Sequence, residues 1–268
     1  MEQVGTYAGI GLQSIPTYLL LLLLSTLRVG SFLLSSPFFG SRMVPLPIRI
    51  VFSFGIGVWV LNNIKLPSLE ALVGADLLPI VLQEVLIGVT CGMILSICFG
   101  SVILAGEKIA ATSGLAFASQ VDPSSGAQSP VISQIFQLFL LVLFFSLNGH
   151  LIIFELLFQS YESFPIGGMV NYKNMIENAL LSTDFLFRTA VMIVLPIVSI
   201  LFFMNLGIGF ITKSAPQLNL FSFGFPMTIL GTFFALYFSV DALQFVFGEL
   251  IDEAIGIVKL VLGDLSNG

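Results

Sequence analysis

The sequence predicts an all-α integral membrane protein, with about six long apolar helices that contain breaks and kinks. Of its 268 residues, 57% are hydrophobic and 9% are charged, and the mean hydropathy is +1.06. Soluble domains carry about 25% charged residues. Apolar runs near the length of about 20 residues that spans a bilayer recur along the chain, and clusters of Pro, Gly and polar residues interrupt them. The lipid bilayer is therefore the first predicted partner.

Composition and spacing exclude several functional classes. The net charge of −6 leaves no basic patch for a nucleic acid. The chain has one His, and its two Cys residues, Cys91 and Cys98, share one apolar run without metal-site spacing, so we predict no metal and no other cofactor. An HExxH motif and a GxSxG motif are both missing. We therefore predict no catalytic residues and a protein that is not an enzyme.

Six segments are predicted to be helical: residues 16–34, 49–64, 77–105, 131–158, 184–211 and 227–247. The third is longer than the hydrocarbon is thick, so it must tilt, kink or project beyond the bilayer. Asn148-Gly149-His150 predicts a helix end or local unwinding inside the fourth segment. Pro196 predicts a kink in the fifth. An amphipathic tail follows at 249–268.

Small residues recur at intervals of four in the third segment, at Gly88, Gly92, Ser96 and Gly100. This spacing predicts a face that packs closely against another helix, although membrane helices are rich in Gly in any case. Glu84 lies four residues before this stripe and on the same side. A buried partner could meet its carboxylate there.

Arg28, Glu84 and Asp241 are predicted to be buried charges within apolar segments. One interpretation is that they carry protons or ions. The other is that they form pairs that set helix register and subunit contacts. We favour the structural interpretation, because a subunit of an assembly needs many buried polar contacts.

The stretch from Gly106 to Pro130 is rich in turn signals, including Asp122-Pro123 and Ser129-Pro130. It nevertheless carries the apolar run 115–118, which a solvated loop does not need. An irregular segment beside membrane helices must lie outside lipid, pack within protein or line a water-filled cavity. We predict that this loop lies in a conduit and closes it; the alternative is an aqueous connector.

Three long interrupted stretches carry a family resemblance. They are Arg28 followed by SPFFGSRMVPLPIRI, then GEKIAATSGLAFASQVDPSSGAQSP, and then KSAPQLNLFSFGFP. In this order, and over essentially the whole chain, they resemble the FliR family of flagellar export-gate proteins, which is homologous to the SctT family of virulence type III secretion systems. The match is closer to the flagellar branch.

The resemblance implies a subunit of the flagellar type III protein export gate, which helps form and close the channel for unfolded flagellar proteins. The implied partners are the FliP and FliQ export-gate proteins, the FlhB switch protein and the unfolded export substrates. The implied location is the bacterial inner membrane, at the base of the flagellum. An ion-coupled secondary transporter is the alternative, although the chain shows no internal repeat.

The resemblance also implies an architecture and a plug. Residues 1–180 would form a FliP-like helical part that contains a plug loop at 106–122. Residues 181–268 would form a FliQ-like helical hairpin and the amphipathic tail, and the whole would be built for a helical hetero-oligomeric assembly. Leu115, Phe117 and Ala118 would project into the channel and seal it by excluding water. Gly106, Gly114 and Pro123 would be the hinge positions of the plug loop.

Overall fold

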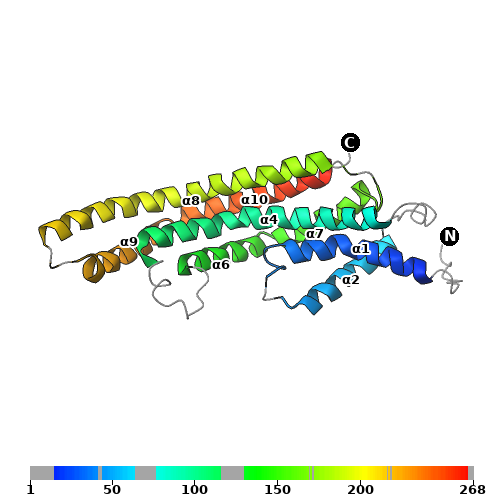
Figure 1. Ribbon diagram of the computed structural model, residues 1–268, viewed down its shortest axis with the longest axis horizontal. Coiled ribbons are helices and arrows are strands. Elements are labelled where there is room, and N and C mark those ends of the chain that lie inside the picture. Colours follow the sequence, from blue (N-terminus) through cyan, green and yellow to red (C-terminus); the bar gives the residue numbers. More distant parts are fainter. Residues whose placement is uncertain are drawn as a thin grey trace. The chain divides into compact units, whose positions relative to one another are not determined.

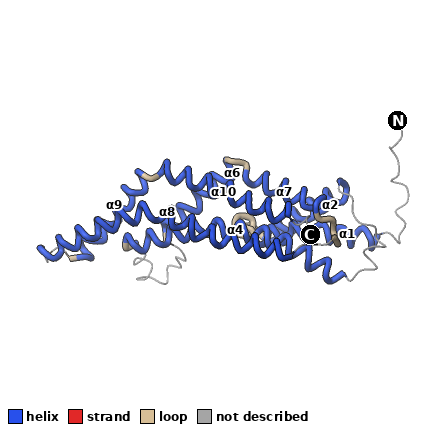
Figure 2. Tube along the Cα trace, turned by 90° about the horizontal axis from the view of Figure 1, so that it is seen from above, coloured by secondary structure: helices blue, strands red, loops and turns tan. Residues whose placement is uncertain are grey.

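The computed structural model describes residues 15–41, 44–63, 77–115, 130–168, 170, 172–215, 217 and 219–264, and helices dominate this part of the chain (Figure 1). The helices, in chain order, are α1 (Ile15–Ser35), α2 (Leu46–Asn63), α4 (Leu77–Ser113), α6 (Val131–Ser146), α7 (Gly149–Ser163), α8 (Tyr172–Ser214), the π-helix η2 (Leu220–Gly224), α9 (Phe225–Phe238) and α10 (Val240–Asp264). Figure 2 shows helix and short loops throughout the described residues.

Within the described residues, four helices, α1, α2, α4 and α8, are long and apolar enough to cross a membrane. The α6–α7 pair, which is interrupted at Leu147–Asn148, makes a fifth if it crosses as one broken span. The protein is therefore an all-α integral membrane protein, as predicted. Of the six apolar segments that were predicted, the last is divided at Ser239, and its first part, α9, has only 14 residues, fewer than the about 20 that span a bilayer.

The chain divides into two compact units, each built from separate parts of the sequence. Unit 1 comprises Met1–Ser96, Ile152–Ala179 and Ile257–Gly268, and unit 2 comprises Ile97–Leu151 and Leu180–Gly256. These units follow packing rather than chain order. The sequential division at residue 180 describes a family relationship instead, and it stays a prediction.

In unit 1, α1 lies between α2 and the first part of α4. On one side, Ser25 Oγ donates a hydrogen bond to Gly57 O at 3.2 Å. A Cβ added at Gly57 would lie 2.3 Å from Thr26 Cγ2, so α2 approaches as closely as glycine allows. On the other side, a Cβ added at Gly88 would lie 2.1 Å from Arg28 O. Small residues on both neighbours therefore determine how α1 is enclosed.

In unit 2, aromatic side chains of α6 fill the core between α4 and α10. Phe144 contacts Phe99 edge-on, with ring centroids 5.5 Å apart. Phe136 contacts Phe247 in the same way at 5.7 Å. All four rings are buried. Between helices in a membrane, van der Waals packing of such rings replaces the hydrophobic effect as the source of stability, so these contacts fix the position of α6 beside the long helices.

The 43-residue helix α8 begins at Tyr172, well before the expected start at residue 184. Its first turns carry Lys173 and Glu177, whose side chains are 80% and 60% exposed, and this polarity has the pattern of a connector. Further along, α8 buries one stripe with a spacing of four residues, at Phe185, Thr189, Ile193, Ile197 and Leu201. Its other faces are apolar and exposed, with Phe203 and Phe210 each 71% exposed.

Candidate functional site

The candidate site consists of the two helix ends on either side of residues 116–129, here called the stems, and both belong to unit 2. The first stem is the end of α4. Ser113 is buried, and its Oγ donates a hydrogen bond to Ala110 O at 3.0 Å. Gly114 then adopts a φ of +85°, a left-handed conformation that favours glycine and ends helices. The helix therefore stops at a position that the sequence specifies.

The start of α9 holds this first stem in place. Thr228 is buried, and its Oγ1 donates a hydrogen bond to Ser113 O at 2.9 Å. Gly114 lies directly against Phe225, because an added Cβ would be 2.4 Å from Cδ1 of that ring. The start of α9 thus lies against the end of α4, and the two interrupted stretches meet where Phe225 contacts Gly114. Sequence reasoning singled out both stretches but had no signal for the contact between them.

The second stem is the start of α6. Pro130 precedes the helix with φ −58° and ψ 148°, and Gln134 N donates to Pro130 O at 3.2 Å. Ser133 packs on α4, since a Cβ added at Gly106 would lie 2.5 Å from Ser133 Cα. Ser133 Oγ also donates to Ile103 O at 3.2 Å. This stem is therefore bound to the helix that carries the first one.

These contacts correct the predicted boundary of the plug loop. Gly106 was expected to begin the loop and act as a hinge, but it is buried inside α4, which continues to Ser113. Its role in the structure is to let α6 approach closely. Gly114 does stand where the helix ends. Pro123 lies outside the described residues.

Of the three predicted plug residues, only Leu115 is among the described residues. Leu115 is the last described residue before the loop, and it is half-buried. Phe117 and Ala118 lie outside the described residues. The stems themselves present hydroxyl and carbonyl groups that are engaged in hydrogen bonds. This arrangement fixes the two ends of a loop, and it supplies no group suited to covalent or acid–base chemistry.

A second polar cluster lies in unit 1, around Arg28. The Nε and Nη2 atoms of Arg28 contact the Glu84 carboxylate at 2.9 and 3.0 Å, and both side chains are fully buried. Nη1 donates to Ser160 Oγ at 2.9 Å, and Nη2 also donates to Phe164 O at 3.0 Å. The guanidinium carbon lies 4.1 Å from the centre of the Tyr161 ring. Every guanidinium nitrogen therefore has a partner.

The cluster connects three helices of unit 1. Arg28 comes from α1, Glu84 from α4, and Tyr161 from α7. Tyr161 also contacts α1 directly, because its hydroxyl donates a hydrogen bond to Ser25 O at 2.7 Å. This closed set of partners matches the structural interpretation of the embedded charges. The sequence indicated that Arg28 and Glu84 would be buried, but it did not connect them with each other or with α7.

The four small residues on α4 contact two different helices. Gly92 and Ser96 meet α1: a Cβ added at Gly92 would lie 2.0 Å from Ser35 Oγ, and Ser96 Oγ donates to Ser35 O at 2.7 Å. Gly88 also meets α1, as described above. Gly100 belongs to unit 2, where an added Cβ would lie 3.4 Å from Leu186 Cδ1 of α8.

Asp241 was predicted to be buried, and this prediction is wrong. It is exposed, and it lines a pocket of about 470 Å³ in unit 2 together with Glu249 and Asp252. The buried face of α10 is formed instead by Leu243, Phe247 and other apolar residues. Asp241 is offset from that face by the helical repeat, so its side chain points away from the core.

Known proteins resemble this chain over most of its length. The sequence pattern of the family described as "Bacterial export proteins, family 1" matches residues 19–254. Flagellar biosynthetic protein FliR of Escherichia coli (strain K12) is 32% identical over 207 residues, covering 76% of this chain and 77% of the relative. The FliR protein of Bacillus subtilis (strain 168) is 31% identical over 221 residues, covering 80% and 83%. That of Aquifex aeolicus (strain VF5) is 31% identical over 215 residues, covering 79% and 82%.

The match spans α1 through most of α10, so it includes the helix ends on both sides of the loop, the Arg28 cluster and the small residues of α4. The chain belongs to the bacterial export proteins of family 1.

Proposed function

We propose that this protein is a subunit of the flagellar type III protein export gate. It helps form and close the channel through which unfolded flagellar proteins leave the cell interior. Its partners are FliP, FliQ and the FlhB switch protein, and its location is the bacterial inner membrane at the base of the flagellum. Family membership supports this proposal, because relatives that share about a third of their residues with this chain are flagellar biosynthetic proteins.

The surface of α8 is the structural observation that carries the proposal. At about 1.5 Å per residue, a helix of 43 residues is roughly 64 Å long, about twice the thickness of the hydrocarbon. One stripe of α8 is buried by its own chain, and the other faces expose Phe, Leu, Ile, Val and Met. Lipid cannot cover an apolar helix over that whole length. Neighbouring subunits are the natural cover for the remainder.

Closure of the channel falls to the loop between the two stems. Leu115, Phe117 and Ala118 form an apolar seal that excludes water and ions while the gate rests. The contacts of such a seal are individually weak, so an unfolded chain can displace it. The stems stay fixed during this displacement, because Thr228 and Ser133 hold them to neighbouring helices.

Ion-coupled transport is the weaker proposal. It requires a carboxylate that can bind and release an ion during a cycle. Both oxygens of the Glu84 carboxylate are engaged by Arg28, and Asp241 is exposed rather than embedded. Neither carboxylate has the surroundings of a coupling site.

Native mass spectrometry tests the proposed function. The chain is produced together with flagellar FliP and FliQ and extracted gently. We expect a large complex that contains one copy of this chain among several copies of the smaller subunits. A stable monomer or homodimer that ignores those partners would reject the proposal and favour the transporter alternative.

A further inference from the structure

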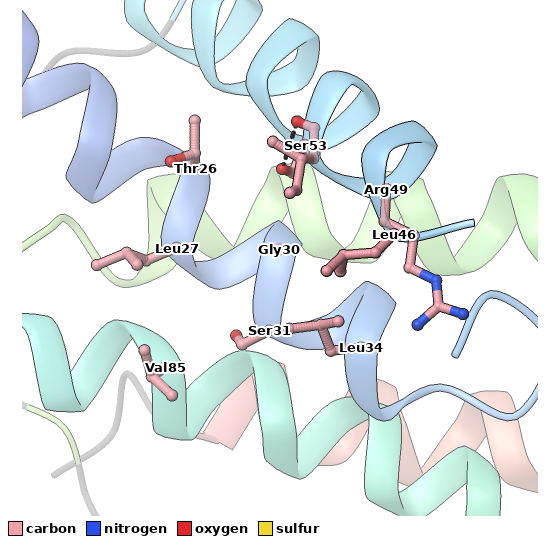
Figure 3. Close-up of a pocket in the computed structure, with 10 residues that line it drawn as sticks. Thr26, Leu27, Gly30, Ser31, Leu34, Leu46, Arg49, Ser53 and Val85 are labelled. Atoms are coloured by element: carbon pink, nitrogen blue, oxygen red, sulfur yellow. Dashed lines mark hydrogen bonds between the residues drawn. The ribbon is translucent and has the colours of Figure 1, made fainter. Parts of the chain in front are cut away.

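An apolar groove lies in unit 1, between α1, α2 and the first part of α4 (Figure 3). Its volume is about 280 Å³. The apolar side chains along it are Leu27, Leu34, Leu46, Ile50 and Val85. Figure 3 shows Thr26 and Leu27 at one end of the groove and Arg49 at the other. The groove therefore combines a hydrocarbon lining with a single cationic end.

The hydroxyl groups along the groove are already satisfied by the main chain. Thr26 Oγ1 donates to Leu23 O at 2.7 Å, Ser31 Oγ donates to Arg28 O at 3.0 Å, and Ser53 Oγ donates to Ile50 O at 2.9 Å. Their protons are thus used within their own helices. The interior of the groove consequently behaves as an apolar surface.

In contrast to these hydroxyl groups, the Arg49 side chain has a buried donor without a described partner. Among the described residues, the single hydrogen-bond partner of its side chain is Ser41 O, which accepts from Nη2, and no described carboxylate forms an ion pair with it. The Nε atom is buried and has no described partner. Leaving a charged donor unpaired is costly, and the planar guanidinium binds phosphate through two parallel hydrogen bonds. The Arg49 end of the groove therefore favours an anion.

The position of Arg49 along the chain specifies the kind of anion. It lies in the first turn of α2, which is one of the candidate spans. Long basic side chains at the end of a span reach the level of the lipid headgroups. From that end, the groove continues along apolar side chains toward Leu27. We propose that this groove binds one anionic phospholipid, with its phosphate on Arg49 and part of an acyl chain along the apolar lining.

A polypeptide fits this groove less well. An α-helix with its side chains is about 10 Å across, and it needs a wider and longer surface than a groove of about 280 Å³. The volume lies just below the range of about 300–1,000 Å³ that is typical of small-molecule sites. A single hydrocarbon chain requires only a narrow channel. Charge and shape together favour the lipid.

Native mass spectrometry with defined lipids tests this proposal. The full chain, in whatever complex it purifies, is stripped of lipid and titrated with phosphatidylglycerol or with phosphatidylcholine of the same acyl composition. We expect this chain to account for one retained phosphatidylglycerol. The Arg49→Gln variant should need a concentration roughly tenfold or more higher for the same occupancy, because a charge-assisted contact is lost.

Two pairs of variants separate the headgroup from the acyl chain. Arg188→Gln removes the same charge from an exposed position in unit 2, and it should bind as the wild type does. Gly30→Leu has room for its Cβ, which would lie 3.7 Å from Ser53 Cβ, and its remaining atoms would fill the groove and displace the lipid while Arg49 stays intact. Gly55→Leu is its control, since nothing lies within 4 Å of a Cβ there.

The following results would overturn the proposal or assign the groove to another partner. Equal retention of the two lipids by the wild type would overturn it. So would phosphatidylglycerol retention that neither Arg49→Gln nor Gly30→Leu reduces. Loss of a protein subunit from the complex on Gly30→Leu, without loss of lipid, would instead assign the groove to a protein interface. The readout is lipid occupancy, so a failure of the lipid proposal can be distinguished from a failure of the proposed export-gate function.

Discussion

Arg28 and Glu84 lie 56 positions apart in the sequence and meet through two hydrogen bonds of 2.9 and 3.0 Å at a site with no exposed surface. The pair connects α1 with α4, and Ser160 adds α7 through Nη1 of Arg28. A buried charge is costly unless it is fully paired. The folding of unit 1 and the pairing of these two residues therefore depend on each other.

Glu84→Gln tests this dependence. The substitution keeps the shape of the side chain but leaves the Arg28 charge without its counter-charge in the core. We expect the free energy of unfolding to fall by about 3–5 kcal/mol. The measurement is chemical unfolding in detergent, followed by far-ultraviolet circular dichroism.

A double substitution, Arg28→Met with Glu84→Met, supplies the comparison. Removing both charges is expected to restore much of the stability, because a buried ion pair is often replaced by apolar residues at little cost. Lys173→Met, which breaks the exposed pair with Glu177, should change stability by less than about 1 kcal/mol. If the double variant were no more stable than Glu84→Gln, the unpaired charge would not be the cause.

Gly92→Ala should destabilise the contact between α1 and α4. The added Cβ would lie 2.0 Å from Ser35 Oγ and 2.9 Å from Ser36 N, so the helices must separate. Overpacking of this kind costs about 1–3 kcal/mol. The same change at Gly55, where nothing lies within 4 Å, should leave the unfolding midpoint nearly unaltered. Equal midpoints for the two variants would contradict close packing at Gly92.

Thr228→Val removes the hydroxyl that holds the first stem of the loop and keeps the shape of the side chain. Ser113 O then loses a hydrogen bond in a buried position, which costs about 1–3 kcal/mol locally. We expect faster hydrogen exchange of the main-chain amides near the end of α4. Thr232→Val is the matched control, because Thr232 Oγ1 donates only within α9, to Thr228 O at 2.7 Å. Identical hydrogen exchange in both variants would argue that the Thr228 hydroxyl does not hold the end of α4.

Phe117→Ala should weaken the closed seal of the proposed gate. Phe117 is the largest apolar side chain of the proposed plug, so its truncation should let water and ions enter. The measurement is ion leakage across membranes that contain the assembled complex at rest. Phe117→Leu, which keeps an apolar side chain of similar bulk, should leak far less. No increase in leakage for Phe117→Ala would remove Phe117 from the plug.

Asp241→Asn should leave both assembly and export largely intact. The side chain is exposed and forms no ion pair within the described residues, so its charge has little to stabilise. Secretion of a flagellar substrate and recovery of the complex are the two readouts. Complete loss of export from a normally assembled complex would return ion coupling to consideration.

The helical class could be read from the sequence, because apolar runs of spanning length are a local property. The break at Asn148 was also visible, since a polar and flexible tripeptide interrupts an apolar run there. Asn148 has a φ of +56° and Gly114 a φ of +85°, as such breaks require. Local chemistry thus predicted the break at Asn148, whereas α4 continues to Ser113, beyond the predicted end at residue 105.

Relationships between distant residues could not be read in this way. Nothing near Arg28 specifies Glu84 or Tyr161, and nothing near Ser113 specifies Thr228. Gly106 was taken for a hinge because glycine is common in loops, whereas here it allows Ser133 to approach. The fifth helix was predicted to begin at residue 184, whereas α8 begins at Tyr172. Tertiary packing decided each of these cases.

The exposed apolar faces of α8 also bear on how long a newly made chain survives in the cell. A helix whose surroundings are completed only by other subunits leaves the lone chain with surface that proteases and chaperones recognise. Its abundance should therefore follow the supply of those subunits rather than its own rate of synthesis. Stoichiometric production of the apparatus would then result from turnover of unassembled copies.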